Sequence, residues 1–239
     1  MDFDKFRWSF SQWENYDGCP ARWKFKSILK LPSSPPGPAA ARGLEMHDRV
    51  EKYITGHRDD LSPPDMMFGD RKPAVISPCY IPIIDAYRDH PNGDRHCEKR
   101  ISFDHDWSIN GTRAKEGGCM TILDAVRVEK GLVRIGEWKS GKPKDRHKDQ
   151  RSLYALAGLI SYFMPTDGRV EVTTYYLELP NESPKRLKVT GEDLPKLMDK
   201  WTSRAKDMAR NQICAPRPGP HCNWCDYARR KGGPCQFGR

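Results

Sequence analysis

Residues 121–140, TILDAVRVEKGLVRIGEWKS, contain two apolar runs that flank the dipeptide Lys130-Gly131. Two strand-like runs joined by such a dipeptide are typical of a tight β-hairpin. With the turn centred on this dipeptide, Asp124 lies directly opposite Glu137. Opposed side chains of a hairpin have Cβ atoms about 4.5–5.5 Å apart. The sequence therefore predicts that this hairpin brings two carboxylates together.

The two carboxylates are expected on an apolar face of the hairpin. Because side chains alternate along a strand, Val126 shares the face of Asp124, and Ile135 shares that of Glu137. An exposed acidic pair is the ordinary alternative, but it fits poorly with a face that points to the core. Burial of two unpaired carboxylates is costly, and a divalent cation between them offsets that cost.

An ammonium group is expected beside the carboxylates, because Lys139 points the same way as Glu137. Oxygen ligands next to an ammonium suit Mg or Mn. Such a cation generates hydroxide and neutralises a phosphate, while Lys139 positions the water or stabilises charge in the transition state. This group of residues indicates hydrolysis of phosphodiester bonds.

The remainder of the chain predicts an α/β (α+β) fold, with a central mixed sheet flanked by helices. The expected helices cover residues 9–30, with a break at Gly18 and Pro20, and residues 39–54, 146–163 and 191–212. The expected strands lie within residues 95–139, 170–179 and 186–189. Three parts are predicted: an N-terminal helical segment with a Pro-rich linker (1–38), a core (39–212) and a Cys-rich C-terminal segment (213–239).

Length and composition indicate one compact domain with appendages, and the positive net charge makes a polyanion the first partner to test. The 239 residues have a formal net charge of +9, and 37% of them are hydrophobic. No apolar stretch approaches the roughly 20 residues of a membrane span, and the charged N-terminus does not resemble a signal peptide. We therefore expect a cytoplasmic protein without a membrane partner, located in the host cytoplasm if a phage encodes it. A reducing compartment favours metal ligands or free thiols over disulfides for the eight cysteines.

The carboxylate pattern resembles the signature of a known family. Asp124 followed by Glu137-Trp138-Lys139 is similar to the motif of PD-(D/E)XK nucleases. Gln150 and Tyr154 lie one helical turn apart and resemble the QxxxY element of the RecB-like branch, which borders the active site and contacts DNA. The resemblance implies a restriction-endonuclease-like core and catalytic roles for the two acids, the lysine, the glutamine and the tyrosine.

A histidine motif extends the resemblance upstream. Residues 43–47, GLEMH, together with Glu51, resemble the G-x-x-x-H motif of the same branch, whose histidine joins the metal shell. The implied metal ligands are His47, Asp124 and Glu137. One position departs from the pattern, because Thr121 stands where the family often has glycine, three residues before its aspartate.

Three late cysteines indicate a second site. Cys222, Cys225 and Cys235 lie within fourteen residues, so they supply three soft ligands. Spacing alone leaves the fourth ligand open. Cys214 or His221 would complete a structural zinc knuckle within this segment, whereas a distant cysteine would have to be brought in by the fold.

A resemblance also identifies a distant cysteine as the fourth ligand. The context of Cys19-Pro20 is similar to the N-terminal element of RecB-like and CRISPR-associated exonucleases, in which one early and three late cysteines hold a 4Fe-4S cluster. It implies a structural cluster on Cys19, Cys222, Cys225 and Cys235 that joins the two ends of the chain, with zinc as the alternative. The other cysteines, Cys79, Cys97 and Cys119, are expected to be free, buried thiols.

DNA is the expected partner. Residues 139–151 hold six basic and two acidic side chains, and residues 201–239 hold eight and two, which suits a phosphate backbone. Stacking on bases is a possible role of the N-terminal aromatic residues, but their helical spacing favours core packing; they are Trp8, Trp13, Tyr16 and Trp23.

The function expected from these features is a Mg- or Mn-dependent deoxyribonuclease. The resemblance implies an exonuclease on single-stranded DNA or DNA ends, in recombination, repair or end processing, with recombination or CRISPR-adaptation proteins as candidate partners. An endonuclease or flap nuclease stays open. Two other classes remain as alternatives: a non-catalytic DNA-binding or recombination scaffold, and a zinc-binding adaptor for proteins.

Overall fold

The computed structural model describes residues 2–64, 72–91, 93–111, 117–163 and 168–237. Its helices are α1 (Phe10–Gly18), α2 (Pro20–Trp23), α3 (Pro38–Ile54), α4 (Ile81–Arg88), α5 (Arg146–Phe163) and α6 (Leu194–Arg210). Its strands are β1 (Arg7–Ser9), β2 (Arg95–Phe103), β3 (Gly118–Glu129), β4 (Leu132–Lys139), β5 (Arg169–Tyr176) and β6 (Lys185–Thr190). A π-helical stretch, Lys24–Ile28, continues α2.

These strands form one mixed sheet in the order β1-β3-β4-β5-β6, with β2 also paired to β3. The β1–β3 and β4–β5 pairs are parallel and the remaining pairs are antiparallel. The β3–β4 hairpin has the predicted register, because Val126 pairs with Ile135 and Glu129 pairs with Leu132. Gly131 takes the left-handed conformation in the turn, at φ 72°. The predicted mixed sheet and its hairpin are thus confirmed.

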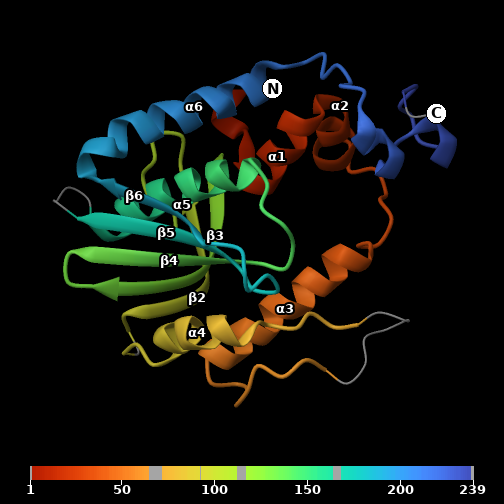
Figure 1. Cartoon of the computed structure of the whole chain (residues 1–239). Coiled ribbons are helices and arrows are strands. Elements are labelled where there is room, and N and C mark those ends of the chain that lie inside the picture. The colour runs from red at the N-terminus through yellow and green to blue at the C-terminus, as the bar shows by residue number, and fades with distance from the viewer. Residues whose placement is uncertain (1, 65–71, 92, 112–116, 164–167, 238–239) are drawn as a thin grey trace.

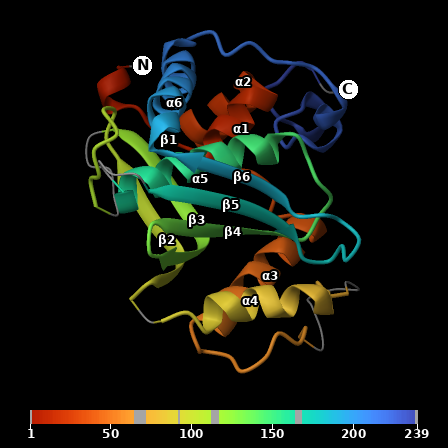
Figure 2. The same ribbon diagram turned by 60° about the vertical axis from the view of Figure 1, so that its left-hand side comes forward.

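Helices cover both faces of the sheet (Figures 1 and 2). One face carries α5, with α6 and α1 packed around it, and the other carries α3 and α4. Each side has its own hydrophobic cluster: Val126, Ile135 and Leu153 belong to the first, and Met46 and Trp138 to the second. The sheet is therefore buried on both faces, and any site between it and a helix is partly shielded from water.

Tryptophans pack the N-terminal segment against the core. Trp8 stacks on Trp201 at a centroid distance of 5.7 Å, and Trp13 meets the same ring edge-on at 5.2 Å. Trp23 is fully buried and Tyr16 contacts it edge-on. The three tryptophans are core residues, as their spacing predicted, and Tyr16 is half-buried against the same core.

Some local features differ from the sequence-based expectations. No element was expected over residues 79–94, where α4 lies. Leu44 shares the predicted buried face of α3 but is 63% exposed, and Cys79, expected to be buried, is exposed at a short helical turn. Cys97 is half-buried, and only Cys119 of the three has the predicted deep burial.

Among the described helices, none is both long and apolar enough to cross a membrane.

Candidate functional site

Carboxylates from three adjacent strands form a row near α3. Asp124 lies on β3, and the pairs that flank it place Glu137 of β4 on one side and Glu98 of β2 on the other. The backbone N–H of Trp138 donates to Asp124 Oδ2 at 2.9 Å, which fixes this carboxylate across the hairpin. Thr121, the departure from the family pattern, pairs normally with Ile101, so β3 keeps its path to the site.

The two predicted carboxylates are buried. Asp124 is 7% exposed and Glu137 is 1% exposed. Burial raises the pKa of Asp124 well above its usual range, and the nearby charge of Glu137 raises it further. Glu137 Oε1 accepts from Gln150 Nε2 at 2.8 Å and from Lys139 Nζ. Among the described residues, nothing donates to the buried Glu137 Oε2, so one carboxylate oxygen is left for a ligand outside the protein.

Lys139 completes the predicted triad. Its Nζ contacts Glu137 Oε1 and its side chain is 24% exposed. Burial disfavours the ammonium, but the charges of Glu137 and Asp124 outweigh this effect and raise the pKa of Lys139. Lys139 is therefore a cation at neutral pH, next to the carboxylates and partly open to solvent.

Helix α5 supplies the glutamine and the tyrosine. Gln150 Nε2 lies 2.8 Å from Glu137 Oε1 and 3.0 Å from the Tyr154 hydroxyl. Burial raises the pKa of Tyr154 far above its usual range, so the phenol stays protonated. Because this face of α5 packs on the sheet, Gln150 reaches Glu137 directly, and Tyr154 contacts Gln150.

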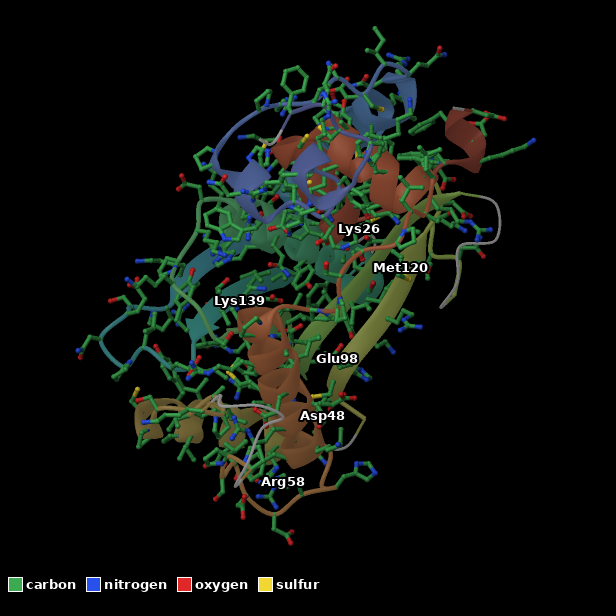
Figure 3. The ribbon with its side chains drawn as sticks, turned by 90° about the vertical axis from the view of Figure 1, so that its right-hand side faces the viewer. Lys26, Asp48, Arg58, Glu98, Met120 and Lys139 are labelled. Atoms are coloured by element: carbon green, nitrogen blue, oxygen red, sulfur yellow. The ribbon has the colours of Figure 1, made fainter. Side chains whose placement is uncertain are left out.

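His47 and Glu98 complete the group on the side of α3. His47 Nδ1 lies 3.5 Å from Asp124 Oδ2, and burial lowers the pKa of the histidine, which favours the neutral, ligating imidazole. His47, Glu98 and Asp124 offer ligand atoms that all lie within 4.8 Å of one another. In Figure 3, α3 crosses the view between Glu98 and Lys139. One imidazole and two carboxylates, with the unpartnered Glu137 oxygen nearby, are a donor set that fits a divalent cation.

Glu98 is the residue that sequence reasoning missed. Burial and the charges of Glu51 and Glu137 raise the pKa of Glu98 to about 7. The hairpin rule that paired Asp124 with Glu137 does not extend to β2, because residues 104–117 separate β2 from β3 and do not reveal the register. Only an acidic residue in a strand-like run, HCEKRI, was visible in the sequence.

The four predicted cysteines come together at the other end of the molecule. Cys19, Cys222, Cys225 and Cys235 line one narrow cavity, along with Phe25 and His221. Cys19 lies in the break between α1 and α2, where Pro20 starts the second helix. In Figure 1, α2 lies beside the C-terminal segment. The structure thus places side chains from two segments that are distant in sequence around one cavity.

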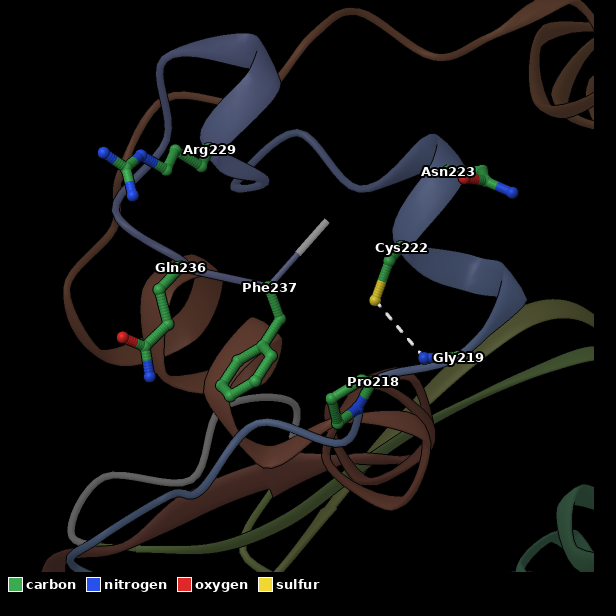
Figure 4. Close-up of a pocket in the computed structure, with 7 residues that line it drawn as sticks. All are labelled: Pro218, Gly219, Cys222, Asn223, Arg229, Gln236 and Phe237. Atoms are coloured by element: carbon green, nitrogen blue, oxygen red, sulfur yellow. Dashed lines mark hydrogen bonds between the residues drawn. The ribbon is translucent and has the colours of Figure 1, made fainter. Parts of the chain in front are cut away.

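Backbone N–H groups point at two of these sulfur atoms. Arg217 N–H donates to Cys19 Sγ at 3.5 Å and Gly219 N–H donates to Cys222 Sγ at 3.4 Å, the second of which is drawn in Figure 4. Burial raises the pKa of Cys235; the Phe237 N–H opposes this effect, and the other three cysteines add to it. Such N–H···S bonds stabilise thiolate ligands. The thiol of Cys214 instead donates to its neighbour Asn211 O at 2.9 Å.

A buried histidine at the start of α5 predicts a pH effect on stability. His147 Nδ1 lies 3.1 Å from the Tyr176 hydroxyl. Burial and then the charge of Lys139, ahead of three further basic residues, lower the pKa of His147 to about 4. The folded-state pKa lies below the usual value of 6.5, so the unfolded chain binds a proton at His147 more readily than the folded protein does. The contribution of the neutral histidine to stability is therefore complete above pH 6.5 and is lost as the pH falls from 6.5 toward 4.

His147→Gln is therefore expected to lose less stability than the wild type between pH 7 and pH 5, with a difference on the order of 1 kcal/mol. Urea unfolding of both proteins at the two pH values measures it. Carboxylates titrate in both proteins, so only the difference between them reports on His147. Equal losses in the two proteins would contradict a buried neutral histidine.

Comparison with known proteins identifies the family. The model of the PD-(D/E)XK nuclease superfamily matches residues 7–71 and 116–230 of this chain. This match spans well over half of the chain, and it contains His47, Asp124, Glu137 and Lys139. The chain therefore belongs to the PD-(D/E)XK nuclease superfamily. Members of this family use divalent metals, and DNA is the substrate that the family implies.

Two solved structures match the chain at low identity. The crystal structure of SSO0001 is 14% identical, with a TM-score of 0.46, covering 98% of this chain and 87% of that one. A protein from Eubacterium rectale whose name includes the word exonuclease is 11% identical, with a TM-score of 0.48 and coverages of 95% and 88%. No curated protein matches the chain.

Proposed function

We propose that this protein is a Mg- or Mn-dependent DNA exonuclease that acts on single-stranded DNA or DNA ends. The observation that supports this most is the buried Glu137 Oε2, which has no protein partner in the described structure and lies in the same cluster as Asp124 and Lys139. A buried carboxylate oxygen without a donor is costly. A divalent cation at this point would satisfy it.

Each site residue then has a defined task. Asp124, Glu137 and His47 would hold the cation, which supplies a Lewis acid and a hydroxide source when it is bound. Lys139 would orient the attacking water and stabilise the charge that develops on the phosphate. Gln150 holds one oxygen of Glu137, and Tyr154 holds Gln150, so these two are positioning residues in the proposed reaction.

DNA binding is supported by charge. The basic residues of 139–151 begin at the catalytic lysine, and those of 201–239 extend to the cysteine segment. Within that segment Trp224 is 74% exposed, and Arg230 donates to the carbonyl of its neighbour Asn223. A basic surface with an exposed aromatic ring suits a single strand, whose phosphates and bases it can contact together. Recombination, repair and CRISPR adaptation are the processes that such an enzyme would serve.

We propose further that the four cysteines hold a structural 4Fe-4S cluster. A mononuclear zinc site has Zn–S bonds of about 2.3 Å, so its sulfur atoms lie about 3.8 Å from one another. In the parts of the chain that the structure describes, no set of three cysteine or histidine ligand atoms from this segment lies within 4.8 Å. This wider spacing favours a cluster over zinc. Iron, sulfide and zinc analysis of protein purified without oxygen distinguishes the two.

Digestion of DNA tests the proposed activity. End-labelled linear strands and closed circles are incubated with the wild type in Mg²⁺ or Mn²⁺, and with Asp124→Asn as the matched inactive variant. Progressive shortening of linear DNA, with intact circles and no activity in the variant, is the expected result. Cut circles would make the protein an endonuclease. Absence of metal-dependent cleavage on every substrate would favour the DNA-binding scaffold.

A further inference from the structure

Glu98 occupies an unusual backbone conformation in the middle of a strand. The residues on either side of it pair regularly with β3, yet its own φ is +46°. A side chain with a Cβ is disfavoured in this left-handed region, because Cβ approaches the carbonyl oxygen. Strain of this kind persists where the surrounding structure enforces it, and it is concentrated at functional sites. The distortion is located at the strand position opposite Asp124.

The charges around Glu98 do not explain why it stays there. In the described chain its carboxylate has no hydrogen bond and no ion pair, whereas other strand acids, such as Glu171, have several basic partners. Glu51 and Glu137 lie close enough to repel it, and Arg100 is the one described cation that opposes them appreciably. A solvated strand glutamate would turn away from this acidic cluster. Glu98 instead keeps a ligand oxygen within 4.8 Å of both Asp124 and His47.

We propose that Glu98 is a ligand of the divalent cation, acting with His47 from α3 and Asp124 from β3. The inference deepens the proposed function, on which it rests, because it adds a ligand that the Asp…Glu-x-Lys motif does not contain. A second observation supports it: the neighbouring Glu137 has an exposed side-chain fraction of 2% and a buried oxygen without a donor. Glu98 and one oxygen of Glu137, on either side of Asp124, therefore have no donor within the described structure, and one bound cation would serve both.

The donor set also indicates which cation binds best. One imidazole with three carboxylates, those of Asp124, Glu137 and Glu98, favours a metal that accepts nitrogen as well as oxygen ligands. Mg²⁺ retains its water molecules and takes few protein ligands, whereas Mn²⁺ binds more tightly to mixed sites. We therefore expect Glu98 to contribute more to the affinity for Mn²⁺ than to that for Mg²⁺.

Binding of Mn²⁺ without DNA tests the assignment independently of cleavage. Electron paramagnetic resonance of free Mn²⁺ gives the dissociation constant of the wild type, of Glu98→Gln and of Asp48→Asn. Asp48 is the matched control, because it is an exposed acid on α3 next to His47 and is outside the ligand group. Figure 3 labels both residues, Asp48 on α3 and Glu98 on β2. Glu98→Gln is expected to weaken Mn²⁺ binding at least tenfold, and Asp48→Asn less than twofold.

A second variant separates ligation from folding. Glu98→Gly removes the carboxylate and suits the left-handed backbone, so its melting temperature without metal is expected to be no lower than that of the wild type. The increase in melting temperature that Mn²⁺ gives the wild type is expected to disappear. This combination excludes misfolding as the cause of weak binding.

Other outcomes would overturn the assignment. Wild-type affinity for Mn²⁺ in Glu98→Gln would show that Glu98 is not a ligand, and the proposed nuclease would stand if the wild type still digests DNA. Equal weakening in Glu98→Gln and Asp48→Asn would assign the effect to net charge. A wild type that binds no Mn²⁺ and cleaves no DNA would overturn both the ligand and the proposed function.

Discussion

Replacement of Lys139 by alanine is expected to lower kcat for DNA cleavage by about 10²–10³-fold, while Mn²⁺ binding stays unchanged or becomes tighter. Lys139 contacts Glu137, and the charges of Glu137 and Asp124 raise its pKa, so it is a cation at neutral pH. In the proposed reaction, its ammonium stabilises charge that appears only in the transition state. Removal of that positive charge leaves the carboxylates more negative, which favours a divalent cation in the site.

Metal binding and cleavage have to be measured on the same preparations. Lys142→Ala is the matched control, because Lys142 is exposed and three positions along the chain from Lys139. It removes one positive charge without touching Glu137, so we expect at most a small increase in KM. Glu137→Ala is expected to lose both Mn²⁺ binding and cleavage. Loss of Mn²⁺ binding in Lys139→Ala would contradict a purely electrostatic role, and cleavage near the wild-type rate would remove Lys139 from the mechanism.

The hairpin of the site could be predicted because its information is local. The turn at Gly131 fixes the register of β3 and β4 over a few residues, and strand alternation then fixes the face of each side chain. The long helix α5 was predicted for a related reason, since it has enough turns to show its pattern. Asp124 and Glu137 therefore followed from neighbours in sequence.

The remaining features depend on contacts between distant segments. Glu98 joins the site through the pairing of β2 with β3 and through a positive φ, and the sequence pattern reveals neither. Helix α4 has eight residues with Pro82 in its first turn, so its periodicity is too short to recognise. Leu44 lies at the edge of the apolar stripe of α3, and nothing in the described structure covers it. Whether a side chain at the edge of a helix is buried depends on tertiary contacts, which the helical pattern does not show.

The C-terminal segment around the cysteines has only a small hydrophobic core. Cys225, Tyr227 and Ala228 form the small core of the C-terminal segment, and Phe25 packs on it from the N-terminal segment. So few buried side chains provide little stability by themselves. A cluster shared by both segments would therefore be the main link that keeps the C-terminal segment in place.

Substitution of Cys19 by alanine is accordingly expected to destabilise the protein by about 5 kcal/mol in the chain-entropy model. Cys19 and Cys222 are about 200 residues apart in sequence, and a cross-link that closes so long a loop restricts the unfolded chain strongly. Urea unfolding gives the stability, and limited proteolysis locates the first opening, which we expect in residues 213–237. Bound iron is expected to be lost with it.

Two other cysteines make the experiment specific. Cys79→Ala is the matched control, because this thiol is exposed and distant from the cluster cavity, and it should retain both iron and stability. Cys214→Ala tests the zinc alternative, in which Cys214 is the fourth ligand. Loss of metal in Cys214→Ala with retention in Cys19→Ala would establish a local zinc knuckle, since a C-terminal site of this kind does not need the N-terminal cysteine. Retention in Cys214→Ala with loss in Cys19→Ala would mean that one metal group holds both ends of the chain together.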